Sequence, residues 1–330
     1  MARENVQGLA LAIIEEGKVA HVAACGRRSA ERNLPLTVDT IMYGASLTKT
    51  AFACLVLQLV DEGRLGLDAP VGELLPRPLP EYTDYADLAD DERWRLLTPR
   101  ILLMHSSGFA NFRWLEADGR LRFHHDPGRR YGYSGEGFYI LQLILEEGLG
   151  LDVGREMQTR VFDRFGMTNT SIADQARLWV GIVRGDGLSA ASRAEPVRPQ
   201  APITSLHQFP TLMAETEPRN AGIGLAAGLA VVTFRDRTGP AWFKGGHNDW
   251  TGNMVVCLES GRRCVVLLAN DVRAERLYPE LIRVILGDTA LPWAWEYDWL
   301  DVPRRPHLPT PPDRPPPARP ARSGTLVSSC

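Results

Sequence analysis

The stretch "YGASLTKTAFACLVLQLVDEG", residues 43–63, carries the strongest structural signal in this chain. Its apolar run predicts a helix over 46–62, and Gly63 is the residue type that most often ends a helix in the left-handed conformation. Ser46 and Lys49 are three residues apart, so they lie on one face of the first helical turn. A hydroxyl and an amine are therefore expected to meet where this helix begins.

Lysine is rare in this chain, which makes Lys49 informative. The 37 basic residues comprise 34 arginines and three lysines, at positions 18, 49 and 244. Arginine keeps its proton in proteins, whereas a lysine can accept one if burial and a nearby positive charge lower its pKa. A serine becomes a nucleophile only when a base takes its proton. Ser46 and Lys49 are therefore predicted to be a nucleophile and its base.

Two further segments add chemistry to this pair. Lys244 opens "KGG" on a predicted strand, where a fixed cation and a close glycine backbone can lie along a substrate. Tyr133 opens "YSG", and a tyrosine held near two ammonium groups would have a lowered pKa and could relay protons. Lys18, in "EEGK", is predicted to be a solvated charge in a turn. The segment "GYSGE" ends in Glu136, so it is not the G-x-S-x-G elbow of the α/β-hydrolases.

These elements, in this order, resemble the serine β-lactamase and penicillin-binding-protein superfamily, in particular its branch of class C β-lactamases, DD-peptidases and family VIII esterases. Similar segments include "FACLVLQLVDEGRLGLDAPVGELLP", "LLMHSSGF" and "VFDRFGMTNTS". The resemblance implies that Ser46 is acylated, that Lys49 is its base and that Tyr133 relays the proton. It also implies that Lys244 stabilises the site electrostatically, and that the backbone N–H groups of Ser46 and His247 form an oxyanion hole.

Three glycines are expected to lie at the substrate, and two of them depart from the family pattern. Gly135 stands where the family has asparagine, Gly245 replaces the threonine of K-T-G, and Gly246 keeps its last position. Loss of the asparagine amide removes a partner for a polar substrate amide. An esterase acting on small acyl esters is therefore the leading prediction. The alternatives are a β-lactamase, DD-peptidase or D-amino-acid amidase, which retention of Lys244 favours, and a catalytically silent ligand-binding scaffold.

The predicted fold is α+β: an antiparallel β-sheet flanked by helices and built from both ends of the chain, with an inserted, mostly helical lobe. Strand-length apolar runs occur near both ends, and helical segments lie between them. The site is expected at the seam between the two lobes. The expected strands are 8–14, 18–25, 228–234, 241–244, 252–258 and 263–269. The sheet domain is expected to comprise residues 1–69 and 222–297, and the helical domain residues 70–221. Residues 298–330 are expected to form a Pro-rich disordered tail.

Composition excludes several other classes of function. The net charge of −3 gives no electrostatic case for nucleic acid or an anionic membrane. The apolar runs are too short to span a bilayer, and the first residues lack a signal-peptide pattern, so a cytoplasmic location is expected. A periplasmic location is the alternative if the true start lies upstream. The histidines form no metal motif, so neither metal nor cofactor is predicted. The predicted binding partner is the substrate, a small-molecule ester or amide. The oligomeric state stays open.

Cys257 and Cys264 flank the turn "LESGRR" and could be neighbours on adjacent strands. In a reducing compartment, two free thiols are favoured over a disulfide. We therefore expect both cysteines to be reduced.

Overall fold

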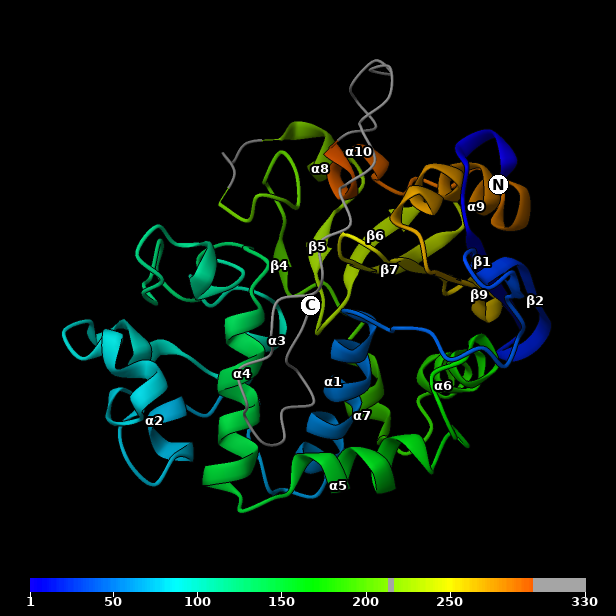
Figure 1. The fold of residues 1–330 in the computed structure, drawn as a ribbon. Helices are drawn as coiled ribbons and strands as arrows, with labels where there is room; N and C mark the ends of the chain where they lie inside the picture. Colours follow the sequence, from blue (N-terminus) through cyan, green and yellow to red (C-terminus); the bar gives the residue numbers. More distant parts are fainter. Residues whose placement is uncertain (213–216, 299–330) are drawn as a thin grey trace.

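The computed structural model describes residues 1–212 and 217–298. Its centre is a nine-stranded antiparallel sheet in the order β3-β2-β1-β9-β8-β7-β6-β5-β4. β1 pairs with β9, with Leu9 opposite Ala269, so the predicted sheet built from both ends of the chain is confirmed (Figure 1). The strands are β1 (Gly8–Glu15), β2 (Lys18–Ser29), β3 (Leu34–Pro35), β4 (Ala201–Pro202), β5 (Ala226–Ala227), β6 (Val232–Asp236), β7 (Gly239–His247), β8 (Gly252–Leu258) and β9 (Arg263–Ala269).

Helices cover both faces of this sheet. Because side chains alternate along a strand, Val266 of β9 packs in one core with Trp179 of α6, whereas Leu267 packs in another with Ile282 of α9. The remaining helices lie mainly below the sheet in Figure 1. The helices are α1 (Leu47–Asp61), α2 (Val71–Leu74), α3 (Pro99–Leu103), α4 (Gly135–Leu143), α5 (Val153–Met157), α6 (Ile172–Arg184), α7 (Ala190–Ala194), α8 (Pro218–Gly222), α9 (Tyr278–Leu286) and α10 (Trp293–Glu296).

α1 connects the helical part of the molecule to the sheet. It is buried along most of its length and contacts α5, α7, β7 and β8, which explains why its sequence is apolar around the whole circumference. It ends as predicted: Gly63 has φ +70°, and its N–H donates to the carbonyl of Val60 at 2.9 Å. A helix packed on all sides fixes the position of its first turn. α1 therefore holds Ser46 and Lys49 rigidly against the sheet.

The expected strand over 228–234 is interrupted. Only the end of this run is in a strand, because β6 begins at Val232 and the residues before it form a turn. Ala230 has φ +61°, a left-handed conformation, and its N–H donates to the carbonyl of Leu103 at 2.9 Å. The chain bends here to meet the end of α3. Apolar residues in a buried turn gave the same pattern as a buried strand.

The prediction that Cys257 and Cys264 are reduced is wrong. They are directly opposite on β8 and β9 and form a disulfide, with Cα atoms 4.2 Å apart. The register of the two strands places both side chains on the same face of the sheet, where opposite residues are in contact. Free thiols were expected because of the predicted reducing compartment, whereas the disulfide depends on the pairing of β8 with β9. The cytoplasmic location itself stays a prediction.

The division into two domains also stays a prediction. α6 lies within the interval 70–221 that was assigned to the helical domain, yet it packs against β1, β2 and β9. The Pro-rich tail predicted for 298–330 lies, apart from Asp298, outside the described residues.

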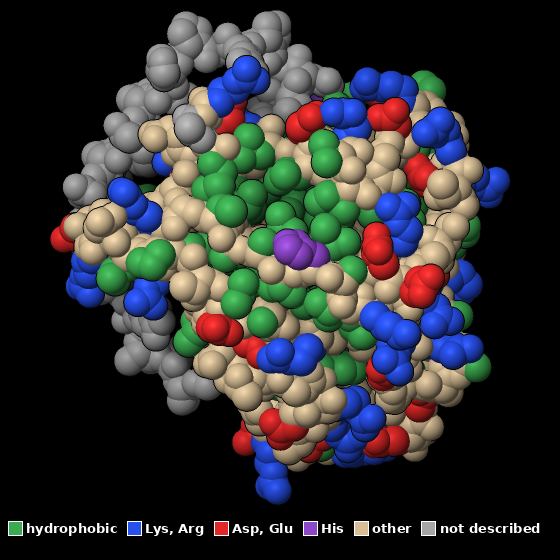
Figure 2. Space-filling view, turned by 90° about the vertical axis from the view of Figure 1, so that its right-hand side faces the viewer, with side chains coloured by type: hydrophobic (Ala, Val, Ile, Leu, Met, Phe, Trp, Pro, Cys, Tyr) green, Lys and Arg blue, Asp and Glu red, His purple; other side chains and the backbone are tan. Residues whose placement is uncertain are grey.

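Apolar side chains gather on the face of the molecule that carries β2 and α9 (Figure 2). A pocket of about 250 Å³ opens there, and Leu11, Ala23 and Leu281 are among the residues that line it. Its lining includes none of the predicted site residues. The pocket therefore belongs to a different surface from the site described next.

Candidate active site

Ser46 and Lys49 meet at the start of α1, as their spacing predicts. Lys49 Nζ donates a hydrogen bond to Ser46 Oγ at 3.3 Å, and both residues are more than nine-tenths buried. Ser46 is the N-cap of α1, but in the described structure its side chain makes no capping hydrogen bond. Its hydroxyl is therefore directed to the amine instead of to the helix backbone. Ala45, directly before it, has φ +46°, a strained conformation of the kind found at functional sites.

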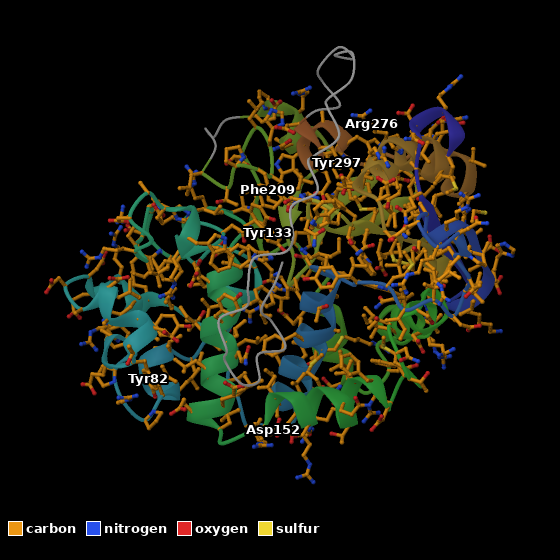
Figure 3. The ribbon with its side chains drawn as sticks, in the orientation of Figure 1. Tyr82, Tyr133, Asp152, Phe209, Arg276 and Tyr297 are labelled. Carbon is orange, nitrogen blue, oxygen red and sulfur yellow. A yellow bond between two sulfur atoms is a disulfide. The ribbon has the colours of Figure 1, made fainter. Side chains whose placement is uncertain are left out.

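Tyr133 and Lys244 form a second pair beside the first. Lys244 Nζ, on β7, donates to Tyr133 Oη at 3.2 Å and lies 4.4 Å from the centre of the tyrosine ring. Lys49 Nζ lies 5.5 Å from the same ring centre. Figure 3 shows Tyr133 at the junction of the helices and the sheet. The structure thus brings all four predicted side chains together, with the phenol between two amines.

His105 is a site residue that the sequence interpretation did not assign. Its ring stacks on Tyr133 with centroids 4.0 Å apart, and its Nδ1 accepts the N–H of Ser134 at 3.2 Å. Burial holds the pKa of His105 well below its ordinary value, and the charges of Lys244 and Lys49 lower it further. A neutral imidazole therefore supports one face of Tyr133. Its place in "LLMHSSGF" was the available signal.

β7 passes close to the first turn of α1 at Gly246. A Cβ atom at this position would lie 3.0 Å from the backbone nitrogen of Ser46 and 3.1 Å from that of Leu47. Such contacts are tighter than ordinary packing, so the approach of the two backbones requires glycine. His247 follows directly on β7. An oxyanion hole made by the N–H groups of Ser46 and His247 stays a prediction, and this close approach supports it.

The side chain of His247 lies beside a buried acid that the sequence interpretation also missed. Its Nδ1 is 3.3 Å from Glu275 Oε1, and Glu275 is 2% exposed. Burial alone would lower the pKa of His247, but the contact with Glu275 and the charges of Glu275 and Glu296 raise it to about 9. Burial raises the pKa of Glu275, which the imidazolium opposes. An imidazolium is therefore favoured at the end of β7.

This pair predicts a loss of stability at alkaline pH. The pKa of His247 is raised from 6.5 to about 9 on folding, so its stabilising effect is complete below pH 6.5 and is lost as the pH rises through 9. The urea midpoint is expected to fall between pH 6.5 and 9. In Glu275→Gln the midpoint should be lower at pH 6.5 and should change less over this range. Equal falls in the two proteins would contradict the assignment.

An aromatic ring fills the space beside Gly135. Any Cβ at this position would overlap the ring of Phe112, which stacks on Trp114 with centroids 4.1 Å apart. The N–H of Gly135 donates to Asn111 Oδ1 at 3.0 Å. Where the resembling family has an asparagine side chain, this protein therefore has the edge of an aromatic pair. Nothing in the sequence linked residue 112 to residue 135.

The described residues contain neither a metal-binding cluster nor a membrane-spanning helix. Among residues 1–212 and 217–298, no three histidine, cysteine or acidic side chains are grouped so that they could hold a metal ion. No helix in the same ranges is long and apolar enough to cross a membrane.

Comparisons with known proteins agree on one family. The family model described as Beta-lactamase matches residues 1–199. The chain is 30% identical over 176 residues to Penicillin-binding protein 4 of Amycolatopsis lactamdurans, a match that covers 49% of this chain and 44% of the relative. It is 35% identical over 110 residues to Esterase EstB of Burkholderia gladioli, covering 33% and 26%. The matches thus span less than half the length of each of these relatives.

A solved structure supports the fold independently. The octameric penicillin-binding protein homologue from Pyrococcus abyssi has a TM-score of 0.66 to this chain, covering 87% of this chain and 75% of its own, at 17% identity. The match to the family model includes Ser46, Lys49 and Tyr133 but ends before Lys244. The structural match covers much more of the chain than the family model does.

Proposed function

Because this chain belongs to the beta-lactamase family, we propose that it is a serine hydrolase that forms an acyl-enzyme on Ser46 and acts on small acyl esters. The observation that carries the proposal is the pairing of Ser46 Oγ with Lys49 Nζ at 3.3 Å. The second pair, Tyr133 with Lys244, lies beside it. Nucleophile, base, proton relay and fixed cation are the parts that acyl transfer needs.

These positions support the following reaction. Lys49, in its neutral form, takes the proton of Ser46, and Oγ attacks the ester carbonyl. The negative charge on the carbonyl oxygen would be stabilised by the N–H groups of Ser46 and His247. Tyr133 then gives a proton to the leaving alcohol, and water attacks the acyl-enzyme by the reverse route. Lys244 Nζ, which donates to Tyr133 Oη at 3.2 Å, would hold this hydroxyl in place.

The surroundings of Gly135 favour esters over amides. The Phe112 ring occupies the space where an amide side chain would project, so a substrate amide would lose a hydrogen-bonding partner at this point. An apolar acyl chain instead gains contact with the aromatic pair of Phe112 and Trp114. The resemblance to Esterase EstB supports the same choice.

A second candidate is a β-lactamase, DD-peptidase or D-amino-acid amidase. The observation that favours it is Lys244, whose ammonium group lies beside Tyr133 and could also attract a substrate carboxylate. The resemblance to Penicillin-binding protein 4 supports it. A catalytically silent scaffold is the remaining alternative.

Hydrolysis of p-nitrophenyl butyrate, measured beside hydrolysis of nitrocefin, tests the proposal. We expect turnover of the ester to exceed that of nitrocefin, and we expect intact-mass analysis to show a butyryl adduct on the wild type and none on Ser46→Ala. Activity on nitrocefin alone would reverse the order of the two enzyme candidates. Absence of labelling by a fluorophosphonate, together with absence of turnover, would favour the scaffold.

A further inference from the structure

A buried carboxylate occupies the space beside Gly245. Any Cβ at position 245 would overlap Glu296 Oε1, so the glycine and the glutamate fit together as a pair. Glu296 is the last residue of α10, far from the K-G-G segment in sequence. The residues on either side of Gly245 already belong to the site: the Lys244 side chain contacts Tyr133, and the Gly246 backbone lies close to the nitrogen of Ser46. Glu296 therefore reaches the strand between two groups of the candidate active site.

The hydrogen bonds of Glu296 are incomplete. Oε2 accepts from Gln208 Nε2, but Oε1 is buried and has no hydrogen-bond partner among the described residues. A buried polar atom without a partner is costly, so its retention calls for an explanation. The charged groups that influence this carboxyl are Lys244, His247 and Glu275. Burial raises its pKa, whereas His247, Gln208 and Lys244 act to lower it.

Gly245 is itself partly exposed, so β7 is open to a substrate at this position. A threonine here would offer a hydroxyl donor to a substrate carboxylate. Glu296 instead brings an unpartnered carboxyl oxygen, Oε1, to the same place. A substrate carboxylate would meet this oxygen there in place of the hydroxyl donor.

We propose that Glu296, through the gap left by Gly245, determines which substrates this site takes: it rejects molecules with a carboxylate next to the scissile bond and accepts those with a hydrogen-bond donor or no charge. This inference deepens the proposed function and rests on Ser46 being the nucleophile. It identifies Glu296 as a specificity-determining residue and not a catalytic one. It also explains how Lys244 can be present without the site preferring anionic substrates.

Binding of two boronic acids tests the inference without requiring turnover. Boronic acids add reversibly to a nucleophilic serine, and 3-carboxyphenylboronic acid differs from phenylboronic acid only by its carboxylate group. We expect the wild type to bind the neutral compound at least about tenfold more tightly. In Glu296→Gln, which keeps the size of the side chain, this preference should fall by about tenfold because binding of the carboxylated compound improves. Asp236→Asn, which removes a buried carboxylate outside the candidate site, is the matched control and should keep the preference.

A second variant guards against a folding defect in Glu296→Gln. The double variant Gly245→Ser with Glu296→Ala places a hydroxyl donor in the vacated space, and it should favour the carboxylated compound more strongly still. An unchanged preference in a folded Glu296→Gln, or the same change in Asp236→Asn, would overturn the inference. Failure of the proposed function has a different result, namely normal boronate binding with no turnover of p-nitrophenyl butyrate and no acyl adduct.

Discussion

Replacing Lys49 by arginine is expected to slow the formation of the acyl-enzyme by about 10³-fold, although the positive charge is retained. Lys49 Nζ is buried against Ser46 Oγ, and the reaction requires it to be neutral when it takes the serine proton. Arginine has no accessible neutral form in a protein. The measurement is the pre-steady-state release of p-nitrophenol from p-nitrophenyl butyrate, with the mass of the adduct followed in parallel.

Lys244→Arg is the matched control for this prediction. It makes the same chemical change at the other buried lysine of the site, where a retained charge is sufficient, and its effect should be clearly smaller. Ser46→Ala sets the background rate, and Lys49→Met tests the loss of the amine without the bulk of arginine. If Lys49→Arg keeps more than about a tenth of the rate, the loss is less than ~1.4 kcal/mol of barrier, and Lys49 is not the base.

Tyr133→Phe is expected to lower kcat/KM for ethyl butyrate by about 10²–10⁴-fold. The substitution removes only Oη, the atom that accepts the hydrogen bond from Lys244, and leaves the ring stacked on His105. An alkoxide needs a proton as it leaves, whereas p-nitrophenolate is stable without one. The fall should therefore be much smaller for p-nitrophenyl butyrate. The ratio of the two rates reports proton transfer and not a loss of folding.

Tyr131→Phe provides the comparison for this experiment. Tyr131 is equally buried and also packs against His105, but its hydroxyl is directed to Gln208 at 3.5 Å. Its removal should change both rates by a similar small factor. An equal fall for both esters in Tyr133→Phe would mean that Tyr133 supports the site without relaying protons.

The features that were predicted correctly depend on residues that lie close together in the sequence or on the order of its motifs. The spacing of Ser46 and Lys49 is sufficient to place them on one helical turn, and alternation or continuity of apolar residues located β8 and β9. The order of the motifs along the chain indicated the family, and with it the meeting of Tyr133 and Lys244. Each of these inferences needed only neighbouring residues or a known order of segments.

The parts that were missed depend on contacts between distant segments. Phe112 lies against Gly135, and Glu296 lies against Gly245, because a loop and α10 return to the site from elsewhere in the fold. In both cases the sequence showed which side chain of the family pattern is replaced by glycine. It did not show which side chain of this protein fills the space. The disulfide was missed for a related reason, since it depends on the register of β8 and β9.

The pairing of β1 with β9 has a consequence for synthesis of the protein on the ribosome. β1 ends at Glu15, but its partner begins only at Arg263, so the strand emerges long before its neighbour exists. At ~5–20 residues per second, this interval is on the order of ten seconds or more, during which one edge of β1 has no partner from this sheet. Lys244 arrives at the end of the same interval. The nascent chain therefore presents Ser46 and Lys49 early and gains Lys244 only after most of the helices of the fold have been made.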